Sequence, residues 1–288
     1  MKTARLLPLL LSMASGAARA EWIADAGTGV VYDSNVSLAQ SRSDIKHDAL
    51  VFAEASGGQF VQLTDRLSGT LTGRVRKELY SRYTGLSNLS AGLSAAARWK
   101  FGLGAGAPWA RLGGSATRLD YRNNLRSGWL YETALSTGIR AFDRWELDAG
   151  YRREHRSADQ DMSLDPDISA AVFSQHASSE WLGARFELTQ SLYPFVRYTR
   201  RSGDITATTQ PNLPIYQVSS AVAFDPVFGT GAIAYKLHAT THIFAAGLTQ
   251  AVGAHASINL SIERRISHGD SDINYYGTAY EAQLLYEF

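Results

Sequence analysis

The chain has 288 residues, of which 45% are hydrophobic and 19% are charged, and its formal net charge at pH 7 is +1. It contains no cysteine, which excludes disulfides, zinc–thiolate sites, iron–sulfur clusters and cysteine nucleophiles. The small net charge gives no reason to expect a nucleic-acid partner, and a mean hydropathy of −0.17 is too polar for a bundle of membrane helices.

The first twenty residues have the pattern of a secretory signal peptide. Lys2 and Arg5 give a basic start, residues 6–11 form a short apolar run, and Ala18-Arg19-Ala20 supplies a small-x-small cleavage signature. An apolar run of this length is too short to be a transmembrane anchor. We therefore expect cleavage after Ala20 and a single exported domain over residues 21–288.

From residue 22 to the last residue, apolar and polar positions alternate with a period of two in one segment after another. Between 89 and 99 the odd positions read Leu, Ala, Leu, Ala, Ala and Trp, and the even positions read Ser, Gly, Ser, Ala and Arg. Because successive side chains of a strand point to opposite faces, the pattern predicts two-faced strands and not helices. We expect strands at approximately 22–33, 47–64, 67–82, 88–101, 108–121, 127–142, 145–156, 173–188, 192–202, 231–249, 255–267 and 275–288.

The breaks between these segments are alternately short and long, as in an up-and-down antiparallel barrel. A soluble sandwich would bury the apolar parity, but here that parity is rich in Ala, Gly and Thr, the polar parity carries full charges, and aromatics stand at segment ends. These features favour an all-β transmembrane barrel with a polar lumen. Twelve strands would place both termini on the periplasmic side, with ten or fourteen as alternatives. Val218–Phe224 offers an extra hairpin, and the opposite parity of Leu112 and Leu119 predicts a bulge in 108–121.

The end of the chain carries the more specific of two resemblances. Tyr280, Leu284, Tyr286 and Phe288, at alternate positions up to the last residue, resemble the C-terminal signature of Gram-negative outer-membrane β-barrel proteins. The resemblance implies the outer membrane as location, outer-membrane lipids as neighbours, and the barrel assembly machinery as a partner that recognises the last strand.

The second resemblance lies at the end of the first predicted strand. The run Tyr32, Asp33, Ser34 and Asn35 is similar to one in the barrel domain of surface lipoprotein assembly modifier proteins. Those proteins assist the export of lipoproteins to the cell surface, so the resemblance implies a surface lipoprotein or a periplasmic partner. The alternative reading is a loop-initiating Asx cluster.

Charged residues on the polar parity cannot face lipid, where an Arg or Lys at the midplane costs about 2–4 kcal/mol. We assign them to the lumen, together with two histidines, as candidates for the pore lining: Arg74, Arg76, Arg98, Arg152, Arg185, Arg197, Arg201, Lys236, His238, His242, Glu263, Arg265 and Glu281. One interpretation is a network of ion pairs that fills the barrel. The other is a selective pore, with an anion-favouring strip made of Arg197, Arg201, Lys236 and Arg265 beside His238 and His242.

No catalytic residue, metal site or cofactor is predicted, because the chain contains neither G-x-S-x-G nor H-E-x-x-H. His268 with Asp270 and Asp272, and His155 near Asp159 and Asp161, offer headgroup or calcium ligands, but solvated loop residues are the favoured reading. The preferred function is non-enzymatic transport across the outer membrane, as a small-solute channel or an export-assisting barrel. The alternatives are an outer-membrane lipid-modifying hydrolase, and a structural or receptor barrel that binds a partner through its external loops.

Overall fold

The computed structural model describes residues 19–160 and 168–288. Residues 1–18 of the predicted signal peptide lie outside the described residues, and Arg19 and Ala20 begin the first strand. Over the described ranges the chain forms one thirteen-stranded sheet, with one α-helix and four 3-10 helices in its connections. None of the helices in these ranges is long and apolar enough to cross a membrane.

The strands follow one another along the chain with few interruptions. They are β1 (Arg19–Asp33), β2 (Asp48–Gln62), β3 (Leu67–Tyr80), β4 (Asn88–Lys100), β5 (Trp109–Tyr121), β6 (Gly128–Ala141), β7 (Trp145–Ala158), β8 (Gln175–Phe186), β9 (Leu192–Thr209), β10 (Ala221–Phe224), β11 (Ile233–Val252), β12 (Ala256–Gly269) and β13 (Asn274–Glu287). The helices are η1 (Thr84–Leu86), η2 (Asn124–Arg126), α1 (Leu213–Val218), η3 (Pro226–Phe228) and η4 (Asp270–Asp272).

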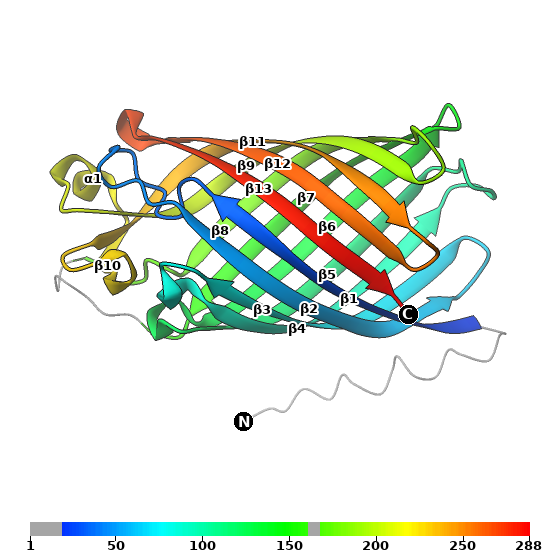
Figure 1. Cartoon of the computed structure of the whole chain (residues 1–288), viewed down its shortest axis with the longest axis horizontal. Coiled ribbons are helices and arrows are strands. Elements are labelled where there is room, and N and C mark those ends of the chain that lie inside the picture. The colour runs from blue at the N-terminus through cyan, green and yellow to red at the C-terminus, as the bar shows by residue number, and fades with distance from the viewer. Residues whose placement is uncertain (1–18, 161–167) are drawn as a thin grey trace, which may run out of the picture.

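Twelve of these strands close into a barrel (Figure 1). Neighbours in the chain pair antiparallel, β9 pairs directly with β11, and β13 pairs back onto β1. β10 pairs only with the first residues of β11 and forms the extra hairpin anticipated at 218–224. The predicted twelve-stranded up-and-down antiparallel barrel is confirmed. The largest departure from the expected bounds is β9, which continues past residue 202 to Thr209.

The bulge predicted in 108–121 is wrong. β5 pairs residue for residue with β4 on one side and with β6 on the other. Leu112 and Leu119 therefore point to opposite faces: Leu112 is exposed on the outer wall, whereas Leu119 lines an inner recess beside Leu130. A leucine on the inner face had looked like a break in register, but the recess accommodates it.

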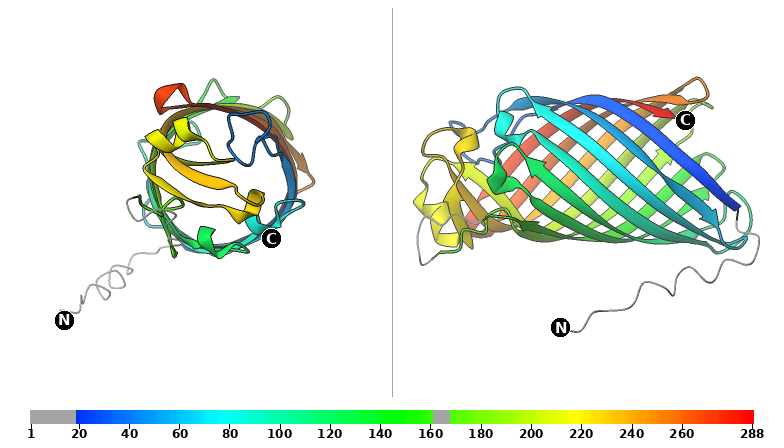
Figure 2. Two further views of the ribbon diagram at one scale, coloured as in Figure 1. Left: turned by 90° about the vertical axis from the view of Figure 1, so that its left-hand side faces the viewer. Right: turned by 90° about the horizontal axis from the view of Figure 1, so that it is seen from below.

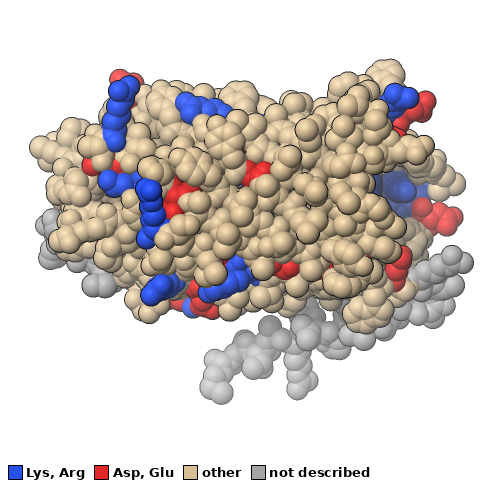
Figure 3. Space-filling view, in the orientation of Figure 1, with Lys and Arg blue, Asp and Glu red and all other residues tan. Residues whose placement is uncertain are grey.

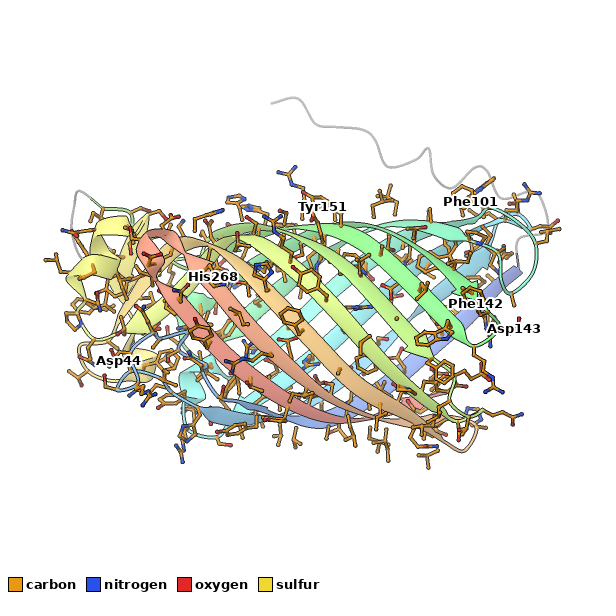
Figure 4. The ribbon with its side chains drawn as sticks, turned by 90° about the horizontal axis from the view of Figure 1, so that it is seen from above. Asp44, Phe101, Phe142, Asp143, Tyr151 and His268 are labelled. Carbon is orange, nitrogen blue, oxygen red and sulfur yellow. The ribbon has the colours of Figure 1, made fainter. Side chains whose placement is uncertain are left out.

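The outer wall is mostly apolar, and its polar side chains lie mainly toward one end. Tyr151 of β7 points away from the barrel (Figure 4), and this fixes the outward parity of β7. Strand pairing then gives the outward parity of the other strands, and large exposed residues such as Leu93, Leu135, Leu182 and Leu248 lie on it. In Figure 3 Lys and Arg gather toward one end of the visible wall and at the opposite rim. This is the distribution expected for a wall that contacts hydrocarbon.

The two ends of the barrel differ. Both described chain ends lie at the end with short connections, which we call the terminal end (Figure 1). Phe101, Phe142 and Asp143 stand in its turns (Figure 4), and Phe142 is 89% exposed. The other end, which we call the capped end, carries the longer connections, among them 34–47 and 210–232.

A cap crosses the mouth of the barrel at the capped end (Figure 2). We define it as residues 205–239, which include the last residues of β9, α1, β10, η3 and the first residues of β11. Consecutive residues such as Ala207 and Thr208, or Ala234 and Tyr235, are all buried, so both faces of these strand ends are covered by protein. Ile215 and Val222 join Tyr235 in an apolar cluster. The cap is therefore a small dry core inside the mouth.

Candidate functional site

The lumen is the candidate site, because the charged parity of most strands faces it. Opposite the outward parity fixed above lie ten of the thirteen predicted residues: Arg74, Arg76, Arg98, Arg152, Arg185, Arg197, Arg201, Glu263, Arg265 and Glu281. Asp33, Glu263, Arg265 and Glu281 line one recess together, as their shared parity requires. Whether these residues line a conducting pore stays a prediction.

The inward placement of Lys236, His238 and His242 is wrong. The inner residues Arg197 and Arg201 of β9 pair with Ala245 and Thr241 of β11, so the odd positions of β11 face inward. His242 contacts the hydroxyl of Tyr198 on the outer wall at 2.8 Å. The sequence was misleading because the apolar residues Tyr235 and Leu237 pack into the cap and not against lipid.

The remaining members of the predicted anion-favouring strip are all paired with acids. Arg197 lies 3.3 Å from Asp148, and Arg201 lies 3.4 Å from Glu154. Arg265 contacts Asp33 and lies 3.4 Å from Glu263. Lys236 donates to the backbone oxygen of Ser174 in the cap region. This wall is an ion-pair network, which was the structural interpretation of these residues.

A second network fills the lumen near the capped end. Arg76 bridges Glu54 at 3.2 Å and Glu78 at 2.8 Å, and its guanidinium lies 3.8 Å from the ring centre of Phe52. Gln283 donates to the other oxygen of Glu54 at 3.0 Å. Two carboxylates share the one guanidinium here, and the side chain of Glu54 is only 5% exposed. These contacts link β2, β3 and β13 across the inner wall.

Unpaired cations gather on a different wall, made by β3, β4 and β5. Arg74, Arg98, Lys100 and Arg111 face the lumen, and no carboxylate of the described residues lies within salt-bridge distance of any of them. We call these four residues the cationic wall. Arg98 and Arg111 are direct cross-strand partners, and Arg98 lies over the ring of Trp109. Like charges placed opposite each other repel, so this wall attracts anions.

A recess of about 290 Å³ lies beside the cationic wall. Arg111 and Arg152 border it, and Ser115, Ser136 and Trp181 supply hydroxyl and indole groups. The indole N–H of Trp181 donates to Asp148 at 2.7 Å, which fixes the ring against the wall. Sequence reasoning missed Arg111 because the expected bulge left the parity of β5 undecided. It missed Trp181 because only Arg185, a charged residue of β8, was assigned to the lumen, and the aromatic residue on the same face was not considered.

The cap is fastened to the barrel by a buried ion pair that the sequence did not reveal. Asp225 has no exposed surface and accepts from Arg126 of η2 and from the hydroxyl of Thr208. The guanidinium of Arg126 lies over the rings of Phe173 and Phe228. The partners are 99 positions apart in loops, where no periodic pattern reports contacts. Burial also raises the pKa of Tyr235, although its hydroxyl accepts the backbone N–H of Asn212.

The motif at 32–35 fastens the first strand to the last. Asn35 is buried and donates to the backbone oxygens of Ala39 and Tyr276, each at 2.9 Å. Ser34 exchanges two hydrogen bonds with Thr278 of β13. Asp33 accepts the backbone N–H of Asn35 at 2.9 Å. The motif thus has the geometry of an Asx turn, which was the alternative to a family signature.

The C-terminal signature residues face outward. Tyr280, Leu284 and Tyr286 share the outward parity of β13, and Phe288 is exposed at the terminal end. Recognition by the assembly machinery remains a prediction.

Among the described residues, the proposed loop ligands are not arranged as a metal site. Over residues 19–160 and 168–288 no group of three or more His, Asp or Glu is arranged to hold a metal ion. Asp159 instead binds Arg118, whose guanidinium holds the pKa of that carboxyl below its ordinary value. Asp161 lies outside the described residues. His268 contacts the side chain of Asn274 at 2.7 Å, and Asp270 and Asp272 lie in η4.

One serine–histidine pair does lie on the outer wall near the capped end. The hydroxyl of Ser202 is 3.4 Å from Nε2 of His238. Asp204 is close in sequence, but it accepts the backbone N–H of His176. The pair was not foreseen, because its residues come from β9 and β11 and their shared face was assigned incorrectly.

No protein-family model matches the chain, and no curated protein matches it in sequence. Solved structures do match its fold. The COG4313 outer membrane channel from Pseudomonas putida F1 matches with a TM-score of 0.58 at 11% identity, over 92% of this chain and 96% of that one. The NanC porin matches with a TM-score of 0.50 at 10% identity, over 92% of this chain and 100% of that one. At such identities the likeness establishes the outer-membrane β-barrel fold alone.

Proposed function

We propose that the protein is an outer-membrane channel for small solutes that favours anions. The observation that carries the proposal is the cationic wall: four lumen cations without an acidic partner among the described residues. In this orientation the terminal end, with both chain ends, faces the periplasm, and the capped end faces the cell exterior. The fold shared with solved outer-membrane channels and the apolar outer wall support this placement.

The lumen is hydrated where the cationic wall lies. Arg74 and Arg111 are exposed although they point inward, and so are Arg185 and Arg197 on the opposite side. A charge in a narrow aqueous lumen bounded by protein and lipid acts over a longer range than the same charge in bulk water. The arginines of the ion-pair networks are shared with at least as many carboxylates, so the cationic wall is the part of the lumen that favours anions.

The cap supplies the control element of this proposal. It occupies the external mouth, and it is made of one long connection fastened by Asp225 and Arg126. Solute entry from outside therefore requires the cap to move or to leave a narrow path beside it. A partner bound at the external connections would act on the channel through this element.

Reversal potentials in planar bilayers test the proposal. Purified protein in a KCl gradient is expected to prefer chloride, and Arg98→Gln/Arg111→Gln should reduce or abolish that preference. Lys77→Gln is the matched control, because Lys77 is a cation of β3 on the outward parity. A variant with a shortened cap should be measured in parallel, because a cap that blocks the mouth would prevent measurement of the ion selectivity of the lumen. Cation preference, or no conductance with the cap removed, would overturn the proposal.

A second candidate function rests on Ser202 and His238. A serine hydroxyl near an imidazole on the lipid-facing side, close to the membrane boundary, is the arrangement that an outer-membrane lipid hydrolase needs. The channel is preferred because Asp204 contacts the backbone of His176 and does not orient His238. Release of fatty acid from phospholipid or lipid A micelles, lost in Ser202→Ala, would establish the hydrolase. No release by the native protein would eliminate it.

The export role suggested by the 32–35 motif has a weaker basis. The hydrogen bonds of Ser34 and Asn35 to β13 account for these residues structurally. A surface lipoprotein partner would require a binding surface elsewhere, and the external connections are the part of the molecule available for it.

A further inference from the structure

The outer wall between β6 and β12 carries polar side chains that a solute channel does not use. Five of the seven histidines face outward here, near the capped end: His155, His176, His238, His242 and His268. Figure 4 looks onto this wall, with Tyr151 and His268 at two of its edges. A lipid-facing surface is expected to be apolar, so this concentration of polar groups requires its own explanation.

The polar side chains border a groove of about 570 Å³. His155 and His176 stack with their Nδ1 atoms 3.1 Å apart, and Tyr131 stacks on His155. Ser202 and His238 line the same groove from β9 and β11. Hydroxyl, phenol and imidazole groups that converge beside aromatic rings are suited to a sugar-based headgroup.

Three arginines of this wall lack a close acidic partner among the described residues. Arg153 and Arg264 have none within salt-bridge distance, and Arg200 is 4.0 Å from Glu180, with both side chains about half exposed. An outward-facing arginine is costly in hydrocarbon. It is stable at a membrane boundary when an anionic headgroup, such as a phosphate, accepts its hydrogen bonds.

The spacing of these arginines indicates more than one phosphate. Arg153 is on β7 and Arg264 is on β12, four interstrand steps away around the barrel. Strand pairing places His268 opposite Arg153, and Arg264 lies four residues further along β12. With about 4.8 Å for each strand step and about 3.3 Å for each residue, the two backbones are about 23 Å apart along the wall. A phospholipid headgroup with one phosphate cannot reach both, whereas a disaccharide with a phosphate at each end spans much of this distance.

An apolar groove of about 910 Å³ runs beside the polar one and reaches Arg264. It crosses the wall from β6 to β12, about 24 Å at the usual strand spacing, which is long enough for an extended acyl chain. Small side chains form its floor, including Ala149, Ala184 and Ala246, and larger ones such as Leu182 and Phe244 flank it. Arg264 at one end of the apolar groove matches the anionic headgroup of a lipid, and the groove itself matches an acyl chain.

We propose that this wall binds one molecule of a phosphorylated, acylated disaccharide of the lipid A type. The polar groove and the three arginines hold its sugar phosphates, and the apolar groove holds one acyl chain. The inference rests on the membrane placement proposed above, with the capped end outside. It does not depend on conductance or on hydrolysis by Ser202.

Binding of purified bis-phosphorylated lipid A to the full-length protein in detergent tests the inference. Replacing a charge-assisted contact by a neutral side chain weakens binding by about tenfold or more, so Arg153→Gln/Arg264→Gln should weaken lipid A binding at least that much. Lys77→Gln removes an outward cation on the far side of the barrel and should leave the affinity unchanged. Equal losses in both variants would mean non-specific attraction and would overturn the proposal.

Filling the apolar groove supplies a test that leaves every charge in place. Ala184→Phe/Ala246→Phe should weaken lipid A binding, while Ala95→Phe, on the outward parity of β4, should not. Heat-modified mobility on denaturing gels shows that each variant is folded. If filling the groove has no effect, the acyl chain is not held there and the proposal fails.

Two further measurements separate this proposal from binding of any anionic phospholipid and from the proposed channel function. If phosphatidylglycerol vesicles compete as well as lipid A for the same site, the glycolipid assignment is overturned. Conductance should be the same in the arginine variants as in the native protein. If the native protein conducts but does not bind lipid A, the lipid site alone is refuted. If the native protein binds lipid A but does not conduct, only the channel is refuted.

Discussion

The capped end and the terminal half of the lumen use the same kinds of residues in opposite surroundings. At the capped end, Asp225 is completely buried and its partner Arg126 is 13% exposed. In the terminal half, the Arg185–Glu146 pair is about half exposed on both sides. A pair in water contributes little to stability, whereas losing one member of a dry pair leaves a buried charge behind. The comparison shows that one barrel has a dry, protein-packed cap at one end and a solvent-exposed interior at the other.

Excising the cap should give the largest effect. β9 and β11 remain paired up to Thr209 and Ile233, so a short glycine-rich turn can replace residues 210–232 without breaking the ring. If the cap limits passage, single-channel conductance should rise several-fold. Shortening the connection 102–107, a turn at the terminal end far from the cap, is the control and should change little. Equal conductance in the two variants would remove the cap from the mechanism.

Breaking the buried ion pair should give the next largest effect. Asp225→Ala leaves Arg126 without its partner and should destabilise the docked cap by about 3–5 kcal/mol. Hydrogen exchange within 210–232 should accelerate while exchange in the barrel strands stays slow. Glu146→Ala, which removes the half-exposed partner of Arg185 in the terminal half of the lumen, should cost about 1 kcal/mol or less. Similar costs for the two variants would contradict the contrast between the two ends.

Arginine substitutions at two neighbouring positions of β4 test which face of the strand contacts lipid and which contacts the hydrated lumen. Leu93 faces outward and Ser94 faces the lumen. Leu93→Arg should destabilise the folded barrel in lipid by about 2–4 kcal/mol near the midplane, measured by denaturant unfolding from vesicles. Ser94→Arg should have little effect because its charge enters the hydrated lumen. The reverse order would invert the assignment of the two faces.

The smallest expected effect concerns the exposed outer rim. The pKa of Asp159 is lowered by its hydrogen bonds to Arg118. The contact therefore stabilises the folded protein at pH values above the ordinary pKa of an aspartate. This stabilisation is lost as the pH falls through the lowered pKa of Asp159. Carboxyl chemical shifts of labelled Asp159 should titrate below the ordinary range of an aspartate side chain. Arg118→Gln should return the pKa of Asp159 to its ordinary range; no change in that variant would contradict the cause.

The strands could be predicted because lipid imposes a regular requirement on the sequence. Each residue on the outer parity must tolerate hydrocarbon, so alternation reports both the strand and its outward face over nearly the whole barrel. The same requirement explains why Arg74, Arg98 and Arg197 could be placed inside from sequence alone.

Prediction failed where protein, and not lipid, covers an apolar face. Tyr235 and Leu237 alternate with Lys236 and His238 just as a lipid-facing strand would, but the cap covers them, and the parity of β11 is therefore reversed. The contact between Arg126 and Asp225 could not be predicted either, because it joins two loops. The pairing of each lumen arginine depends on strand register, which alternation does not specify across the barrel.

The bonds of Ser34 and Asn35 to β13 also bear on how the molecule is made. Their partners, Thr278 and Tyr276, lie in β13, the strand that pairs back onto β1. The ring is therefore closed by main-chain pairing and by these side-chain hydrogen bonds at the same junction. Without β13, both β1 and β12 would have an unpaired edge.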